Sequence, residues 1–141
     1  MVDSLTPGCI FRIPFDFEDG AGPLKKYFIL LGSLKGAAIA VKTTTVIARY
    51  GANPSGYPGI VFLPAPSYPF TKPTVIDPAN GFAIDEPRIE RHSEKSELEL
   101  WDPIEGLLQN IYDVLPLHRS LDKRRKEGYQ TVIRESLLRG G

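Results

Sequence analysis

The chain has 141 residues, a length typical of one domain, and 42% of them are hydrophobic, which is sufficient for a buried core and excludes wholesale disorder. Its 17 Lys and Arg residues balance 17 Asp and Glu residues. With no net charge, no global field draws the protein to nucleic acid or to a membrane, so any nucleic-acid site must come from a local patch.

Glycines and prolines, 13 of each, concentrate before residue 80 and break the chain into short β-rich segments. The predicted strands are residues 9–15, 27–31, 37–45, 60–63 and 73–77, with 82–84 as a last strand or a short helical turn. Residues 16–25 form a loop that is too long for a tight hairpin turn. The sequence DPANG at 77–81 predicts a turn. Five or six short strands of this kind predict a small closed or half-closed β-barrel.

The character of the sequence then changes. Residues 87–101 are charge-dense and weakly patterned, which predicts a linker. A helix is predicted from Asp102, which can cap it, with Pro103 at its first position and apolar residues at helical spacing until Pro116. A second helix is predicted over 120–138. The predicted organisation is a barrel over 1–86, a charged linker over 87–101, and a helical extension over 102–139 that packs on the barrel or on a partner.

The single cysteine, Cys9, bears on the compartment. A lone thiol cannot form an internal disulfide, which favours a reducing environment. The start of the chain has no basic region followed by an apolar stretch, as a signal peptide would have. The longest apolar run, 27–31, is far too short for a membrane span. We therefore expect a cytoplasmic protein without a membrane segment.

Several short motifs over residues 5–85 resemble the PemK/MazF-like toxin family in order and spacing. They are PGCIF at 7–11, PFDF at 14–17, KKYFILL at 25–31, AVKTTT at 40–45, and GYP at 56–58 followed by the segment 60–63. In the family, these places are taken by an opening strand with a phenylalanine-rich loop, a second strand preceded by Arg-Pro, and a third strand with a Thr-rich end.

The resemblance implies an SH3-like barrel, a homodimer, and cleavage of single-stranded RNA that needs no metal or other cofactor. It also implies a partner antitoxin protein that blocks the active groove. In such a reaction the 2′-hydroxyl of the RNA attacks the neighbouring phosphate, so the enzyme must stabilise negative charge and help to move two protons. A cation meets the first need, and a threonine hydroxyl can assist the second.

The resemblance matches Lys26 to the family's catalytic arginine and Thr44 to its threonine, with Thr43 and Thr45 as alternatives in register. Lysine is a point charge and cannot make the planar two-pronged contact that arginine makes with phosphate. Lys26 and Thr44 are therefore the implied catalytic residues of an endoribonuclease, while the missing arginine leaves open a relative that binds without cutting. Lys25 and Thr43 are expected to contact the RNA.

Two further side chains are candidates for RNA contact. Arg12 would widen the basic surface, and Tyr57, which lies in a loop, is the best candidate for stacking an unpaired base. The loop at 15–25 would lie over the groove. The other loop aromatics are expected in the core or an interface, and they are Phe15, Phe17, Tyr68 and Phe70.

Other polar groups have ordinary structural explanations. The basic run at 123–126 is flanked by acidic residues and is expected to be the solvated face of a helix. His92 and His118 give no zinc-binding spacing with one cysteine, so no metal is expected. Asp77 and Asp85 are expected to serve turns rather than to form a carboxylate pair.

An alternative function is a non-catalytic interaction module on the same barrel. The lysine in place of the arginine and the zero net charge favour it. The helical extension would then be a partner or dimer surface, or would itself occupy the groove.

Overall fold

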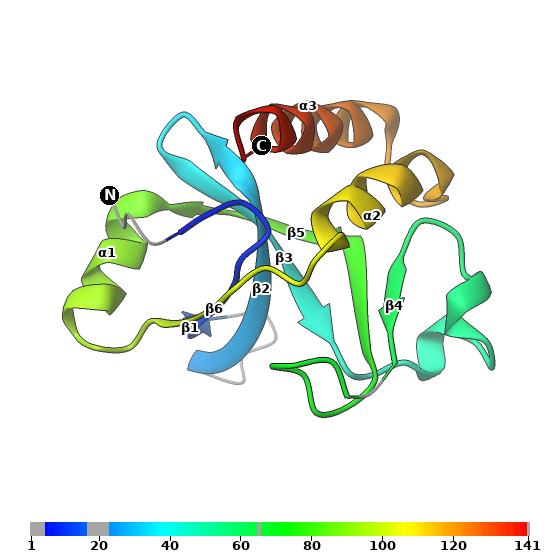
Figure 1. The fold of residues 1–141 in the computed structure, drawn as a ribbon, viewed down its shortest axis with the longest axis horizontal. Helices are drawn as coiled ribbons and strands as arrows, with labels where there is room; N and C mark the ends of the chain where they lie inside the picture. Colours follow the sequence, from blue (N-terminus) through cyan, green and yellow to red (C-terminus); the bar gives the residue numbers. More distant parts are fainter. Residues whose placement is uncertain (1–4, 17–22, 65, 141) are drawn as a thin grey trace.

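The computed structural model describes residues 5–16, 23–64 and 66–140 (Figure 1). Within these residues the chain forms one six-stranded antiparallel sheet and three α-helices. The strands are β1 Ile10–Asp16, β2 Pro23–Leu34, β3 Ala37–Thr44, β4 Val61–Leu63, β5 Thr74–Asp85 and β6 Glu99–Trp101, and the helices are α1 Glu86–Glu94, α2 Leu107–Val114 and α3 Lys123–Gly140. The mainly β class with C-terminal helices is confirmed, whereas the prediction of two helices is wrong.

The additional helix, α1, and the strand β6 both lie in the segment predicted as a charged linker. Helix α1 has Glu86 in its first turn and Pro87 at its start, where these residue types favour a helix. Its Ile89 is fully buried, and β6 pairs with β1 so that Glu99 lies opposite Arg12. One buried apolar residue in a nine-residue helix is too weak a pattern for helical periodicity, which explains the error.

The predicted start of the first C-terminal helix is also wrong. Helix α2 begins at Leu107 rather than at Asp102, because Gly106 takes a left-handed conformation with a φ of 77° immediately before it. The start of α3 is capped by Asp122, whose carboxylate accepts the backbone N–H of Arg125 at 2.8 Å. The first residue of each helix is set by local backbone conformation and side-chain capping. The spacing of apolar residues does not reveal these features.

The strand order in the sheet is β4-β5-β3-β2-β1-β6, and β2 and β3 do not stay paired along their full length. They pair from Leu34, opposite Ala37, to Phe28, opposite Lys42. Before Phe28, β2 pairs with β1, and after Lys42, β3 pairs with β5. The two strands therefore diverge, and Figure 1 shows the opening between their lower ends. We call this region, between residues 26–27 of β2 and 43–45 of β3, the strand fork.

Strand β5 runs through the turn predicted at 77–81. Its pairing with β3 shifts between Ile76 and Gly81, so the residues between them leave the regular ladder. The segments predicted as separate strands at 73–77 and 82–84 are therefore parts of one bent strand. The proline and the Asn-Gly pair mark an irregularity inside that strand rather than a reversal of the chain.

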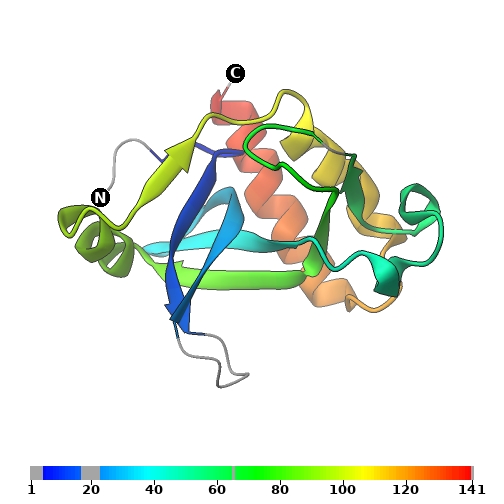
Figure 2. The same cartoon turned by 90° about the horizontal axis from the view of Figure 1, so that it is seen from below.

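Both faces of the sheet are covered. Helices α2 and α3 pack on one face, over a core that includes Ile29, Leu31 and Val41, and Figure 2 shows α3 running along the sheet. The other face carries a second core around Phe11 and Phe28, to which α1 contributes. The C-terminal helices therefore belong to the main core. In the described ranges, no helix has the length and apolar character needed to cross a bilayer.

Candidate functional site at the strand fork

A cavity of about 230 Å³ lies at the strand fork. Tyr27 lines it from β2, Thr43 from β3, and Phe70 from the segment before β5. Its polar lining consists of Thr43, Thr45, Thr71, Thr74 and Lys72. Among the described residues, no acidic side chain and no residue of α2 or α3 belongs to the lining. The helical extension therefore does not occupy this opening.

Lys26 and Thr44, the implied catalytic pair, lie on the two arms of the fork but not in the cavity lining. Each lies two positions beyond the pair formed by Phe28 and Lys42. Side chains alternate along a strand, so both belong to the Phe28 face of the sheet, opposite to the face that bears the cavity. The Lys26 side chain is exposed, and the Thr44 hydroxyl accepts the backbone N–H of Val46 at 3.1 Å.

Thr43 and Thr45 line the cavity from the β3 side. Thr43 is 7% exposed, and its hydroxyl makes no hydrogen bond to any group in the part of the chain that the structure describes. Thr45, by contrast, is exposed at the mouth. Two members of the threonine triplet are thus brought together with Tyr27, while the third, Thr44, points to the other face.

The aromatic wall of the cavity is held in place by neighbouring side chains. The ring centroid of Tyr27 lies 5.2 Å from that of Phe70 and 5.2 Å from that of Trp101. The guanidinium carbon of Arg12 lies 5.1 Å from the Tyr27 centroid and 5.8 Å from the Trp101 centroid. Arg12 therefore supports the wall through cation–π contacts with both rings.

The charge of Arg12 is compensated by Glu99 on β6. Arg12 Nη2 donates to the two carboxylate oxygens at 2.6 and 2.9 Å, and Nε donates to Oε1 at 3.2 Å. This hydrogen bonding raises the pKa of the Arg12 guanidinium above its ordinary value. The predicted role of Arg12 was to widen a basic surface, but its position suits it to orient Tyr27. Because β6 was not predicted, Glu99 could not be recognised as the partner of Arg12 from the sequence.

Of the remaining residues predicted to contact RNA, Tyr57 lies away from the cavity lining. Tyr57 is 42% exposed at the end of the 3-10 helix Pro54–Gly56, and its ring packs edge-on against Tyr50 with centroids 5.0 Å apart. The side chain of Lys25 lies outside the described part of the chain. Residues 17–22, the centre of the predicted loop over the groove, also lie outside it, and so does Phe17.

A buried hydrogen-bonded network joins Tyr50, Asp77 and His118. Asp77 Oδ2 accepts the Tyr50 hydroxyl at 2.8 Å, and Oδ1 accepts His118 Nε2–H at 2.7 Å and the Ala79 backbone N–H at 2.9 Å. His118 Nδ1 accepts the backbone N–H of Leu121 at 3.0 Å, which assigns the ring proton to Nε2. Burial, reinforced by the hydrogen bond to Asp77, raises the pKa of Tyr50 to about 12.

This network is structural rather than catalytic. Ser120 Oγ lies 3.4 Å from His118 Nδ1, so Ser120, His118 and Asp77 resemble a nucleophile, base and acid in series. That nitrogen already accepts backbone N–H groups, and His118 is 4% exposed, so it cannot take a proton from Ser120. The network instead ties the irregular part of β5 to the segment before α3. The other histidine, His92, contacts Glu97 at 2.9 Å.

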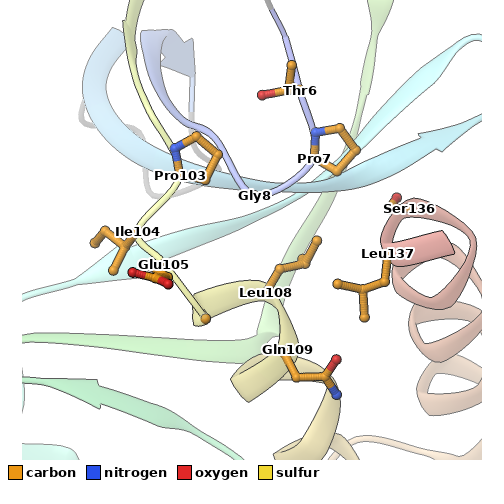
Figure 3. A pocket seen from close by; sticks show the side chains of 11 residues that line it. Thr6, Pro7, Gly8, Pro103, Ile104, Glu105, Leu108, Gln109, Ser136 and Leu137 are labelled. Carbon is orange, nitrogen blue, oxygen red and sulfur yellow. The ribbon is translucent and has the colours of Figure 1, made fainter. Parts of the chain in front are cut away.

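A second cavity, of about 500 Å³, opens between the segment before β1, the segment before α2 and the end of α3 (Figure 3). Pro7, Pro103, Leu108 and Leu137 give it mainly apolar walls. Glu105 is its one ionisable lining side chain in the described ranges. A carboxylate repels phosphate, so this cavity is unsuited to an RNA backbone.

Other potentially reactive groups have structural surroundings. Where the chain is described, no group of three or more His, Cys, Asp or Glu side chains is arranged to hold a metal ion. Cys9 is 2% exposed, and burial raises the pKa of its thiol to about 11, which makes it a poor nucleophile. The basic run at 123–126 begins α3 on the surface, where Lys123 lies 3.9 Å from Glu127.

Sequence reasoning missed the cavity residues Tyr27, Lys72, Thr71 and Thr74, and assigned Phe70 to the core or an interface. Four of these five residues come from the connector around the predicted strand at 73–77, whose prolines indicate a turn-rich path but not its position. For Tyr27 a signal existed, because alternation places it on the same face as Thr43 once the two strands are neighbours.

No family model matches the chain, and no curated protein sequence matches it significantly. The resemblance to PemK/MazF-like toxins therefore rests on the short motifs of the first strands, and the activity it implies stays a prediction.

Proposed function

We propose that the chain binds single-stranded RNA at the strand fork, as a PemK/MazF-like protein with an SH3-like sheet. The observation that carries this proposal is the local chemistry of the fork. Lys72 lines an opening together with hydroxyls and aromatic rings, the exposed Lys26 lies on the β2 arm of the fork toward the other face of the sheet, and no acidic lining residue is found in the described ranges. A protein without net charge needs such a local patch to hold a phosphate backbone.

Cleavage of the bound strand would require Lys26 and Thr44 to reach the same phosphate. Their shared face and their equal distance from the pair of Phe28 with Lys42 support this assignment. Lys26 would stabilise charge on the phosphorane, and the Thr44 hydroxyl would hold the scissile group or assist proton movement. As the resemblance implies, the proposal includes a homodimer and an antitoxin partner in the cytoplasm.

The test measures binding of fluorescein-labelled single-stranded RNA by anisotropy in EDTA, with a gel of the same samples to detect fragments that carry cyclic phosphate ends. We expect Lys26→Ala to weaken binding by about tenfold, the loss of one charge-assisted hydrogen bond. The matched control is Lys95→Ala, which removes an exposed lysine at the end of α1, and we expect it to bind like the parent.

Absence of RNA binding at low salt would overturn the proposal. Binding without fragments would assign a relative that binds but does not cut, and fragments that persist in Lys26→Ala would place cleavage on other residues. The interaction-module alternative loses one of its arguments, because α2 and α3 bury a face of the sheet and need no partner to account for them.

A further inference from the structure

The Thr43 hydroxyl makes no hydrogen bond to the described residues, and its oxygen is accessible from the fork cavity, since no fully buried side-chain oxygen or nitrogen in the described chain lacks a partner. Thr43 is 7% exposed and lines the fork cavity. A hydroxyl that can both donate and accept a hydrogen bond, and that lines an open cavity, is available to a polar ligand.

The aromatic walls of the cavity suit a flat ligand. Tyr27 and Phe70 pack edge to face at 74°, and Pro69 lies beside them in the lining. Tyr27 is further held by Arg12 and Trp101, so its ring position is established before any guest binds. Unpaired bases stack on aromatic side chains in this kind of setting, and a preorganised wall lowers the entropic cost of binding.

The size of the cavity limits the guest to a single ring. Its volume of about 230 Å³ is below the range of about 300–1,000 Å³ that holds drug-sized ligands. The lining offers hydroxyls and one cation, Lys72, and lacks acidic residues within the described chain, so the guest belongs to a molecule with negative charge. A pyrimidine base with its adjoining phosphate satisfies all three conditions.

We propose that the fork cavity receives one unpaired pyrimidine base of a bound RNA strand, and that Thr43 reads its edge by a hydrogen bond. This inference rests on the proposed function. Tyr27 and Phe70 contact the ring, and Lys72 pairs with the adjoining phosphate. Arg12 is a positioning residue, because it acts on the base only through Tyr27. The inference thereby assigns the sequence preference of the protein to the cavity.

The test compares binding of oligo-U, oligo-C and oligo-A by the parent and by Thr43→Val, in EDTA. The parent is expected to favour the pyrimidine oligomers, and Thr43→Val to weaken pyrimidine binding by about fivefold, the value of one hydrogen bond, with oligo-A binding unchanged. Valine has the shape of threonine, and the hydroxyl has no partner to lose, so the melting temperature is expected to stay the same or rise. The matched control is Thr131→Val, whose hydroxyl donates to the Glu127 carbonyl on the surface of α3.

A second measurement separates failure of the inference from failure of the proposed function. Uridine and cytidine, added alone, are expected to shift the backbone amide signals of Tyr27 and Thr43 in a ¹H–¹⁵N spectrum, and adenosine is not. RNA binding without a pyrimidine preference, or with one that Thr43→Val leaves intact, would overturn the base site and keep the proposed function. Nucleoside shifts without RNA binding would overturn the proposed function and would leave a pyrimidine site that does not serve RNA. Absence of both RNA binding and nucleoside shifts would overturn the base site and the proposed function together.

Discussion

Two buried polar side chains next to the β3–β5 ladder differ in how far their hydrogen-bonding capacity is used. The Asp77 carboxylate accepts three hydrogen bonds, from Tyr50, His118 and Ala79. The Thr43 hydroxyl makes none within the described ranges. Loss of the Asp77 carboxylate would leave buried donors unpaired at a cost of about 1–3 kcal/mol, whereas loss of the Thr43 hydroxyl leaves no group unpaired, so the two sites have opposite consequences for mutation. Asp77 stabilises the fold, whereas Thr43 has capacity left for a ligand.

Asp77→Ala is expected to lower the free energy of unfolding by about 2–5 kcal/mol, because it leaves the buried Tyr50 hydroxyl and the His118 Nε2–H without a hydrogen-bond acceptor. Urea denaturation followed by the fluorescence of Trp101 measures this change. Asp85→Ala is the matched control, since Asp85 is exposed and its side chain caps no backbone N–H of α1; its effect is expected to stay below about 1 kcal/mol. Equal losses in the two variants would contradict the assignment.

At this scale the sequence predicted residue types better than residue roles. The threonine triplet was correctly placed at the end of a strand, but a shift of one residue decides which threonine faces the cavity, and only the pairing of Phe28 with Lys42 determines that. Likewise, Arg12 is a basic residue in a strand until Glu99 is placed opposite it. Such long-range pairs have no local signature.

Helix α3 approaches strand β2 closely at one point. Ser136 Oγ donates to the Leu31 carbonyl at 2.8 Å, and the neighbouring residue on β2 is Gly32. A Cβ at Gly32 would lie 2.5 Å from Ser136 Oγ and 2.7 Å from Val132 Cγ1. The missing side chain of Gly32 is therefore what allows the helix to lie on the sheet at this distance.

Two glycine substitutions are expected to move stability in opposite directions. Gly32→Ala should lower the free energy of unfolding by about 1–3 kcal/mol, because α3 must shift to make room. Gly128→Ala, inside α3, meets nothing within 4 Å and should raise it by about 1 kcal/mol through helix propensity. Thermal unfolding followed by circular dichroism compares both with the parent. A stabilising Gly32→Ala would refute the close packing described here.

Elements with a strong local pattern were predicted, and elements defined by their partners were not. The first three strands and the long C-terminal helix follow from β-rich runs and apolar spacing. Helix α1 has a single buried residue, Ile89, and β6 has three residues that are only half-buried. Neither element therefore shows a repeat of apolar residues in the sequence from which it could be predicted. Both contact β1, which is far away in the sequence, and α1 also packs on the adjoining strand β5.

At the scale of the whole molecule, the strand fork and the helices α2 and α3 share one face of the sheet. The sheet opens at the fork because β2 follows β1 while β3 follows β5. Next to the fork, the same face of the sheet is closed by α2 and α3, which cover Ile29, Leu31 and Val41. The sequence indicated a boundary near residue 86, since charge density and proline content change there. The change in composition reflects a change of element type within one core.

A fragment of residues 1–86 is therefore expected not to fold on its own, although the sequence predicted a barrel over these residues. It would lose β6 from the edge of β1 and would expose the apolar face that α2 and α3 cover, a loss far greater than the stability of an ordinary domain. The prediction is checked by the dispersion of its ¹H–¹⁵N spectrum and by its thermal unfolding, with the full chain as the control. Adding the fragment 87–141 should restore dispersed signals if the two parts share one core. A 1–86 fragment that unfolds cooperatively by itself would show that the helices are an accessory to a barrel that is already stable.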